Sequence, residues 1–465
     1  MIATSQQAGV SMPVTDPETG AHVGEVPRHA TKDAVAALDR AFNARADMAA
    51  LPIHARADIL ETAADRLVAK AEAAANLIAR EGVKTITEAR GEVRRAAEVL
   101  RLSAQAARTQ AGSIIAFDQD PNGIDRTGWA APMPIGVVLG ITPFNDPLNL
   151  VAHKLGPAVA AGCPMILKPH EATPLSALLL VELLKDGLPH GAIEVLTGHG
   201  ADLVPPLLAD DRIRMVSFTG GLTTGRKIAE AAGLTRLVME LGSNCATLVM
   251  ADADLDLAAA SCVSGAIAAS GQNCLHVQRI IAQKEVYADL RDRLTAGFDA
   301  VRVRPKLDET SQMGCMIDTS AAARVQGFVD AAVTGGGHVL SGGQRDGVHV
   351  APTLIETVDD TDPLHRDEVF GPVTVLSVVQ DFDHAIARAN AAPFGLQGAI
   401  FTHDLAQART AIDRLDVGAV MINDSTDYRL DAMPFGGTRQ SGLGREGVAC
   451  AVAAMSEPKV ACFRW

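Results

Sequence analysis

Three residues have the types and settings that nucleophilic and acid–base chemistry needs: Cys274, Glu240 and Asn145. Cys274 follows the motif SGQN at the end of an uncharged stretch. A loop at a domain junction gives a cysteine the access and the thiolate character that a nucleophile requires. The alternative is a buried structural cysteine, which is the commoner role for any single cysteine. The local sequence does not separate Cys274 from Cys245 or Cys262.

Glu240 and Asn145 each have a chemical role and a structural alternative. Glu240 lies inside the apolar run LVMELG, where burial of a carboxylate is costly and a raised pKa suits a general base. The alternative is a charge at a strand end that is bonded to neighbouring backbone. Asn145 stands just before Pro147, which opens a helix, and its amide can donate to a developing oxyanion. A capping or turn asparagine is the commoner alternative.

The elements that must position these residues alternate between apolar runs and helical spacing. Strands are predicted at 137–144, 165–169, 193–198, 214–220 and 236–242, with helices at 147–162, 173–187, 201–209 and 223–233 between them. Helices over 31–50, 55–81 and 85–111 precede them, and helices near 253–269, 283–299 and 319–335 follow. This alternation predicts a doubly wound parallel α/β sheet and a second α/β domain. Ligands bind at the carboxyl ends of such strands.

Composition excludes several classes of partner. The 465 residues carry a formal charge of −14, and aromatic residues are only 3%. This argues against nucleic acid and anionic membrane as partners. Seven cysteines without C-x-x-C spacing, and a start without a basic or apolar leader, predict a reduced, cytoplasmic protein. The histidines lack metal-binding spacing, so no metal is expected.

One glycine motif is rejected and another is kept. Gly442, Gly444 and Gly447 match G-x-G-x-x-G, but no strand or βαβ unit precedes them, so they are not taken as a dinucleotide fingerprint. Gly220 and Gly221, after SFTG, let backbone approach a pyrophosphate near a helix start.

Eight segments in order resemble the aldehyde dehydrogenase superfamily over essentially the whole chain. They are PIGVVLGITPFNDPLN (134–149), ILKPHEATPLSAL (166–178), VSFTGGLTTG (216–225), MELGSN (239–244), GQNC (271–274), EVFGPV (368–373), PFGL (393–396) and PFGGTRQSGLGREG (434–447). The separation 274 − 240 = 34 also agrees with that family. The ending looks most like the lactaldehyde and phosphonoacetaldehyde dehydrogenase branch.

The resemblance implies an architecture and a reaction. A Rossmann-type NAD domain is expected from 1–111 and 134–242, a catalytic α/β domain from 243–447, and a small β oligomerisation ribbon from 112–133 and 448–465, in a homodimer or homotetramer. Cys274 would attack the aldehyde, forming a thiohemiacetal and then a thioester. The Asn145 amide and the Cys274 N–H would hold the oxyanion, and Glu240 would activate water.

The resemblance also implies the cofactor site. The residues are Thr142, Pro143, Phe144, Lys168, His170, Glu171, Gly198, Gly220, Gly221, Leu241, Glu368 and Phe370. Lys168 and Glu171 would meet the adenosine ribose, and Glu368 the nicotinamide ribose. Because a carboxylate binds a ribose 2′-OH and repels a 2′-phosphate, Glu171 predicts a preference for NAD, with NADP also possible.

The substrate is expected to be a short aldehyde with hydroxyl or acidic substituents, oxidised to its carboxylate. Asp146, Asn149 and His153 follow i, i+3, i+7 spacing and would form one polar helix face. Such a wall disfavours long alkyl aldehydes. Arg429 precedes PFGG and would pair with an anionic tail. The alternative is a surface arginine bonded to Asp427 or Asp431.

Two other functions are weighed against this one. In a CoA-acylating relative, CoA rather than water would resolve the thioester, and the presence of Glu240 speaks against it. A non-catalytic scaffold that binds NAD or a partner protein would not need Cys274, Glu240 and Asn145 together.

Overall fold

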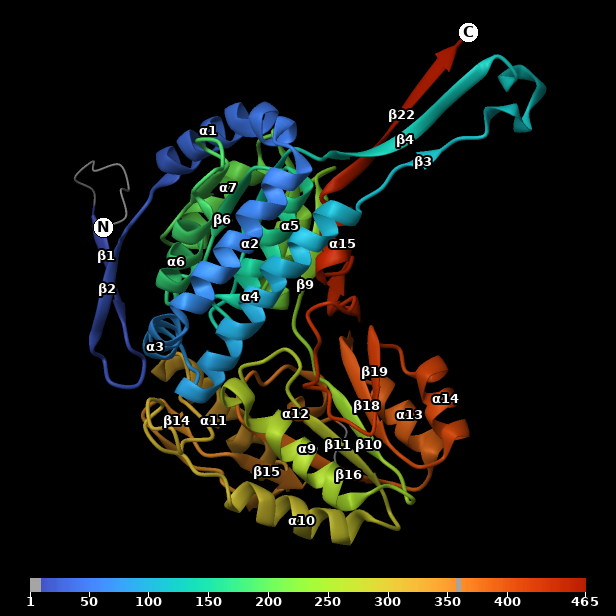
Figure 1. Cartoon of the computed structure of the whole chain (residues 1–465). Helices are drawn as coiled ribbons and strands as arrows, with labels where there is room; N and C mark the ends of the chain where they lie inside the picture. The colour runs from blue at the N-terminus through green and yellow to red at the C-terminus, as the bar shows by residue number, and fades with distance from the viewer. Residues whose placement is uncertain (1–9, 357–360) are drawn as a thin grey trace.

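The computed structural model describes residues 10–356 and 361–465, which form a two-part body and a projecting arm (Figure 1). A six-stranded sheet in the order β21-β9-β8-β5-β6-β7 organises one part of the body, and a seven-stranded sheet in the order β12-β15-β16-β11-β10-β18-β19 organises the other. Both parts are mixed α/β with largely parallel sheets, as the sequence predicts. A short hairpin, β1 (Ser11–Thr15) and β2 (His22–Pro27), lies at the N-terminal edge.

The first sheet is parallel except for its edge strand β21, which runs antiparallel to β9. Its strands are β5 (Val137–Ile141), β6 (Met165–Lys168), β7 (Ile193–Val195), β8 (Ile213–Thr219), β9 (Arg236–Glu240) and β21 (Gly442–Leu443). The strands are nearly continuous apolar runs because helices cover both faces. Adjacent residues therefore serve opposite cores: Val138 packs into one, Val137 into the other.

Helices fill the two layers over this sheet. One layer holds α2 (Ile53–Ala69), α3 (Ala71–Glu81), α4 (Ile86–Thr109), α5 (Asn149–Ala161), α6 (Pro174–Leu184) and α15 (Val448–Ala454). The other holds α1 (Thr31–Ala50), α7 (Gly200–Leu208) and α8 (Leu222–Ala231). The predicted helix over 55–81 is two helices, because the backbone leaves helical geometry at Lys70.

The second sheet is parallel except for β12. Its strands are β10 (Ala246–Val249), β11 (Arg279–Gln283), β12 (His338–Ser341), β15 (Thr353–Glu356), β16 (Val373–Val379), β18 (Gln397–Phe401) and β19 (Ala419–Ile422). The helices around it are α9 (Leu255–Ile267), α10 (Tyr287–Asp299), α11 (Thr319–Thr334), α12 (Pro363–Arg366), α13 (Phe382–Asn390) and α14 (Leu405–Arg414). Two short pairs, β13 (Arg345–Asp346) with β14 (His349–Val350) and β17 (Phe394–Gly395) with β20 (Thr438–Arg439), complete this part.

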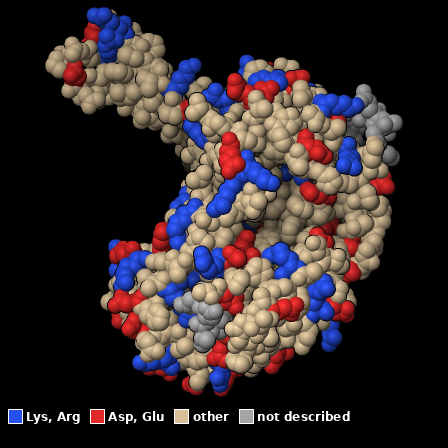
Figure 2. Space-filling view, turned by 180° about the vertical axis from the view of Figure 1, so that it is seen from behind, with Lys and Arg blue, Asp and Glu red and all other residues tan. Residues whose placement is uncertain are grey.

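The arm is a three-stranded antiparallel ribbon of β3 (Ser113–Ile114), β4 (Arg126–Pro134) and β22 (Ser456–Arg464). It carries the 3-10 turns η1 (Phe117–Gln119) and η2 (Pro121–Gly123) and extends away from the body (Figures 1 and 2). Residues 448–454, expected in the ribbon, instead form α15 on α4 and α5. Val448, Ala451 and Val452 have the i, i+3, i+4 spacing of a helix face and enter the first core.

No helix within residues 10–356 and 361–465 is both long enough and apolar enough to cross a membrane.

Candidate active site

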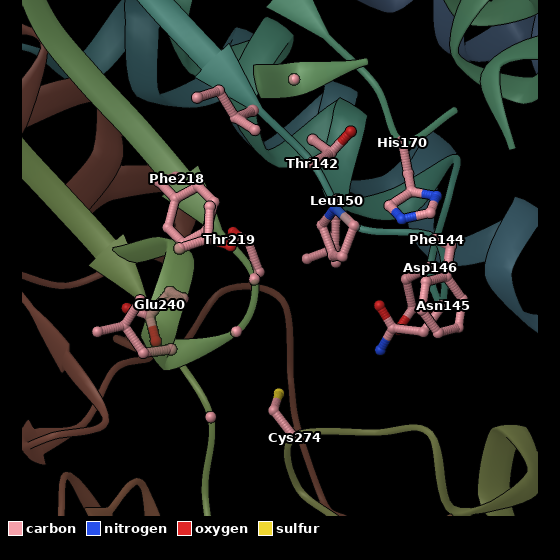
Figure 3. Close-up of a pocket in the computed structure, with 18 of the residues that line it drawn as sticks. Thr142, Phe144, Asn145, Asp146, Leu150, His170, Phe218, Thr219, Glu240 and Cys274 are labelled. Carbon is pink, nitrogen blue, oxygen red and sulfur yellow. The ribbon is translucent and has the colours of Figure 1, made fainter. Parts of the chain in front are cut away.

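A cleft of about 780 Å³ opens at the carboxyl ends of β5, β6, β8 and β9 and is closed on its other side by loops of the second α/β part. This is the edge of a parallel sheet at which ligands are expected. The cleft brings together segments that lie far apart in the sequence, including Asn145, Glu240 and Cys274. Figure 3 shows the Cys274 sulfur pointing into the cavity, with Glu240 on one side and Asn145 on the other.

Cys274 reaches the cleft through an unusual turn after α9. The 3-10 segment η3 (Ala268–Gly271) contains three consecutive left-handed residues, with φ of 49°, 57° and 67° at Ala269, Ser270 and Gly271. A side chain at position 271 would place its Cβ 2.2 Å from the Gly371 carbonyl carbon, so only glycine fits. Such strained backbone marks functional sites and persists only when its surroundings hold it.

Two side chains behind the turn, the buried Gln272 and the partly buried Glu88, hold it in place. Gln272 donates to the Cys315 carbonyl at 3.0 Å and accepts from the Ile317 N–H at 3.0 Å. Glu88 accepts from the Ala269 N–H at 2.7 Å. Together these bonds fix the backbone that presents Cys274.

The half-buried Cys274 thiol is protonated in the free protein. Burial raises its pKa well above the ordinary range, and the nearby Arg429 guanidinium opposes that effect. The Cys274 N–H forms no hydrogen bond within the described part of the chain. It is therefore available, as an oxyanion donor must be.

Glu240 ends β9 with both carboxyl oxygens buried and without a hydrogen-bond partner among the described residues. The expected alternative, a strand-end charge bonded to backbone, is therefore not what the structure has. Burial and then the neighbouring Glu446 raise the pKa of Glu240 well above its ordinary value. A carboxyl group with a raised pKa has the basicity that suits proton transfer near neutral pH.

Gly442, which belongs to the rejected glycine motif, and Gly436, which lies just before it, help to position Glu240. Gly442 in β21 pairs with Glu240 in register, and a Cβ at Gly442 would lie 2.3 Å from the Met239 carbonyl oxygen. A Cβ at Gly436, where φ is +153°, would lie 2.6 Å from Glu240 Oε1. These glycines permit close approach of backbone to the acid, and they do not form a phosphate loop.

A buried ion pair that the sequence analysis missed lies behind Glu240. Lys154 on α5 binds Glu446 Oε1 at 3.0 Å and the Thr219 hydroxyl at 2.9 Å. Although burial acts to raise it, Lys154 and Arg429 lower the pKa of Glu446 to about 2. The available signal was Lys154, which follows His153 in the otherwise apolar helix sequence LVAHKLGPAVAA.

Asn145 is not a helix cap. Helix α5 begins at Asn149 and has no side-chain cap from its own N-terminal residues. The helix is capped instead by Glu92 on α4, whose carboxylate accepts the Leu148 and Asn149 N–H groups at 2.8 and 3.0 Å. The Asn145 side chain is thus left free: its Oδ1 has no partner in the described structure, and Figure 3 shows the amide nitrogen directed towards the Cys274 side of the cavity.

The rest of the cleft has the features that a dinucleotide requires. The buried Thr142 hydroxyl lacks a partner among the described residues. Gly221 precedes α8, and a Cβ there would meet nothing within 4 Å, so the helix N-terminus is open to an anion. Glu368 approaches so closely that a Cβ at Gly242 would lie 2.3 Å from its Oε2. The cavity and its donors and acceptors therefore fit such a cofactor.

Two of the residues predicted to bind the cofactor have strongly shifted pKa values. Burial raises the pKa of Glu368 to about 7, against the effect of the Ser243 N–H, which donates to Glu368 at 2.8 Å. For Glu171, burial acts to raise the pKa, but His170 and Lys168 prevail and lower it to about 2. Glu171 is therefore a carboxylate at neutral pH, with Lys168 Nζ 2.9 Å from its Oε2.

The cleft includes most of the predicted cofactor residues. Those that line it are Thr142, Pro143, Phe144, Lys168, His170, Glu171, Gly220, Gly221, Leu241, Glu368 and Phe370. Phe144 makes edge contacts with His170 and Phe370, at ring-centroid distances of 5.2 and 5.8 Å. Gly198 is the exception. It does not line the cleft but adopts φ of +131° beside the His29 carbonyl, while Gly200 and Ala201 line the cleft instead.

Asn149 and His153 were expected at the substrate but do not line the cleft. Both face Asp431, with Asn149 Nδ2 at 3.3 Å and His153 Nε2 at 2.9 Å from its Oδ1. The i, i+3, i+7 argument fails because Asp146 lies in the turn before α5, outside the helix. Asp146 does line the cleft, where it pairs with Lys84, and Leu150 supplies the helix's contribution.

Arg429 lines the cleft and bonds neither Asp427 nor Asp431. Its guanidinium lies over the Phe435 ring, 3.8 Å from the centroid, and its side chain is 8% exposed. Its Nε and Nη2 are buried without hydrogen-bond partners in the described residues, although Glu446 Oε2 lies 3.5 Å from Nη2. The alternative of a surface arginine is therefore wrong.

Arg95, which the sequence analysis missed, makes the contact with Asp431 that the alternative assigned to Arg429. Its Nε and Nη2 bind Asp431 at 3.0 and 2.8 Å, and it lines the cleft. Asp431 is thus shared by Arg95, Asn149 and His153, and it joins α4 and α5 to the loop that carries Arg429.

The family model described as the aldehyde dehydrogenase family matches residues 3–461. Aspartate-semialdehyde dehydrogenase 1 of Pseudomonas canavaninivorans is 45% identical over 97% of this chain and 96% of its own. A 3-sulfolactaldehyde dehydrogenase of Priestia aryabhattai is 40% identical, covering 87% and 85%. A lactaldehyde dehydrogenase of Methanococcus maripaludis is 33% identical, covering 96% of each chain.

Solved structures agree with these relatives. Aldehyde dehydrogenase 21 from Physcomitrella patens, in complex with the reaction product succinate, superposes with a TM-score of 0.96 at 36% identity, over 99% of this chain and 96% of that one. NADP-dependent glyceraldehyde-3-phosphate dehydrogenase from Bacillus halodurans, complexed with NADP, gives a TM-score of 0.96 at 34% identity, over 98% and 96%.

Proposed function

Because the chain belongs to the aldehyde dehydrogenase family, we propose that it oxidises a short aldehyde with hydroxyl or acidic substituents to the corresponding carboxylate, with NAD or NADP as cofactor. The observation that carries this proposal is the meeting of Cys274, Glu240 and Asn145 in one cleft. When bound, the nicotinamide ring supplies the acceptor for a hydride.

Cys274 is the nucleophile. Its thiol loses its proton to solvent, its sulfur bonds to the aldehyde carbon as the carbonyl π bond opens, and negative charge develops on the carbonyl oxygen. The Asn145 amide and the Cys274 N–H donate to that oxygen, and neither has to give up a protein partner to do so. After hydride loss, the substrate carbon is held on Cys274 as a thioester.

Glu240 resolves the thioester. It takes a proton from water as the water oxygen attacks, and the Cys274 sulfur leaves. Glu446, which binds Lys154 and has a pKa of about 2, stays a carboxylate, so burial and then Glu446 keep the Glu240 pKa high and its carboxylate basic. A CoA-acylating enzyme would not need this base.

Glu171 sets the cofactor preference. Its carboxylate accepts a bond from a ribose 2′-OH and repels a 2′-phosphate, so NAD is preferred. We expect Glu171→Gln to raise the ratio of kcat/KM for NADP to that for NAD about tenfold, since one charged contact is worth about 1.5–3 kcal/mol. Steady-state kinetics with both cofactors measures this ratio. Glu182→Gln, on the exposed side of α6, is the control. An unchanged ratio would remove Glu171 from cofactor choice.

Arg429 binds an anionic substituent of the substrate. We expect Arg429→Gln to raise KM for 4-oxobutanoate (succinate semialdehyde) and to lower its kcat/KM by a further factor of about 10–100 relative to propanal. The ratio is the informative quantity, because Arg429 also acts on the Cys274 pKa for every aldehyde. If the substitution lowers kcat/KM equally for both aldehydes, Arg429 does not bind the anionic substituent.

The arm supports a proposal about the oligomeric state, and the cysteines support a proposal about the location of the protein. Ile114 and Trp465 are 91% and 83% exposed on the ribbon, and Figure 2 shows few charged side chains along its length. An exposed apolar ribbon favours pairing with a second copy. We propose a homodimer or homotetramer. The described cysteines form no disulfide, which suits a cytoplasmic location.

A further inference from the structure

Two opposite charges lie two residues apart on the loop after β19, and both Asp427 and Arg429 line the same cleft as Cys274. The protein does not fill the hydrogen-bonding capacity of either group. Arg429 has two buried guanidinium nitrogens without hydrogen-bond partners among the described residues. Glu446 Oε2 lies 3.5 Å from Arg429 Nη2 without forming a hydrogen bond, so both Asp427 and Arg429 can still bind a ligand atom of the opposite charge.

One carboxylate oxygen of Asp427 is available to accept a hydrogen bond. The Asn273 amide donates to its Oδ1, and its Oδ2 receives no hydrogen bond in the described structure. No described lysine or arginine forms an ion pair with it, because the two nearby cations are committed elsewhere. Lys84 pairs with Glu92 and Asp146, and Arg95 pairs with Asp431.

The electrostatics agree with this geometry. Burial, together with Asp146 and Glu88, raises the pKa of Asp427 to about 8, against the weaker opposing effects of Arg95 and Lys84. Such a group lacks a counter-ion, and a bound cation would favour its carboxylate form.

We infer that the aldehyde carries an ammonium group as well as an acid group, that Asp427 binds the ammonium, and that Arg429 binds the acid. This inference rests on the proposed function and narrows its substrate class to short amino-acid semialdehydes. The chain must be short because Asn273, which holds Asp427, is the residue directly before Cys274. A long substrate would carry its charges beyond both groups.

Four aldehydes test the inference on the wild-type enzyme. Three are 4-oxobutanoates that differ only at C2: 2-amino-4-oxobutanoate, 2-hydroxy-4-oxobutanoate and unsubstituted 4-oxobutanoate. The fourth, 3-aminopropanal, has the ammonium but lacks the acid. We expect the amino acid semialdehyde to have a kcat/KM at least about tenfold above each of the others, since each charged contact contributes about one factor of ten or more.

Asp427→Asn removes the charge and keeps the shape. We expect it to lower the ratio of kcat/KM for the amino compound to that for 4-oxobutanoate by a factor of about 10–100. Asp424→Asn is the matched control, because Asp424 lies on the same loop outside the cleft, where it accepts the Ser425 N–H. Thermal melting checks that both variants fold.

The outcomes distinguish a failure of this inference from a failure of the proposed aldehyde oxidation. Preference for 4-oxobutanoate, equal use of the hydroxy and amino compounds, or an unchanged ratio in Asp427→Asn would each overturn the ammonium site while leaving aldehyde oxidation intact. Absence of turnover with all four aldehydes would instead overturn the proposed function.

Discussion

Replacing Cys274 with alanine should abolish aldehyde oxidation and leave dinucleotide binding in place. Loss of a nucleophile costs on the order of 10⁴-fold or more in kcat, because the remaining groups can bind and polarise the substrate but form no covalent intermediate. The cofactor residues lie on other loops, so affinity for NAD should change little. Reduced-cofactor absorbance measures turnover, and titration calorimetry measures NAD binding.

Cys262→Ala is the informative control for that experiment. Cys262 is buried in the core of the second α/β part, without contact with the cleft, and should retain activity. Cys245 is the closer competitor, since its sulfur lies 3.6 Å from the Cys274 carbonyl oxygen. Turnover that survives in Cys274→Ala but fails in Cys245→Ala would move the nucleophile to position 245. Binding of NAD without turnover by the wild-type enzyme on a broad aldehyde panel would favour the scaffold.

Glu240→Gln should separate the two halves of the reaction. Glutamine keeps the shape of the side chain but cannot take a proton from water, so steady-state kcat should fall by a factor of about 10²–10⁴. The first hydride transfer does not need this base, so one equivalent of reduced cofactor should appear in a burst. Stopped-flow absorbance shows both phases. Glu457→Gln, on the partly exposed Arg236 pair, is a surface control.

The pH profile gives a second reading of Glu240. Hydrolysis needs its carboxylate form, so the wild-type steady-state rate should rise with pH through the raised Glu240 pKa. Glu240→Gln should lose this dependence. Steady-state turnover of Glu240→Gln equal to that of the wild type, or wild-type turnover that requires added CoA and yields an acyl-CoA, would contradict a water-activating role.

The sequence predicts the positions of the strands in the first sheet well, because the signals that mark a strand are local. Near-continuous apolar runs place β5, β6, β8 and β9 to within a few residues, and helical spacing places the start of α4 within one residue of the predicted position 85. The order of motifs is also sufficient to nominate Cys274, Glu240 and Asn145, since each lies at the end of a recognisable strand or loop.

The sequence predictions are wrong where contacts between residues that are distant in the chain determine the structure. The start of α5 is fixed by Glu92, more than fifty positions away in the chain, so Asn149 and His153 face Asp431 and not the substrate. Asp427 accepts a hydrogen bond from Asn273, and Arg429 lies against Glu446 in the turn before α15. No local pattern encodes such contacts, which follow only from packing of the two α/β parts.

Mass spectrometry of a trapped intermediate tests the central claim most directly. Glu240→Gln is mixed with NAD and 4-oxobutanoate, quenched in acid and digested. The account predicts an acyl group, added through a thioester, on the peptide that contains Cys274, in near-stoichiometric yield and only when NAD is present. An acyl group on another cysteine, or burst formation of reduced cofactor without any acylated peptide, would contradict it.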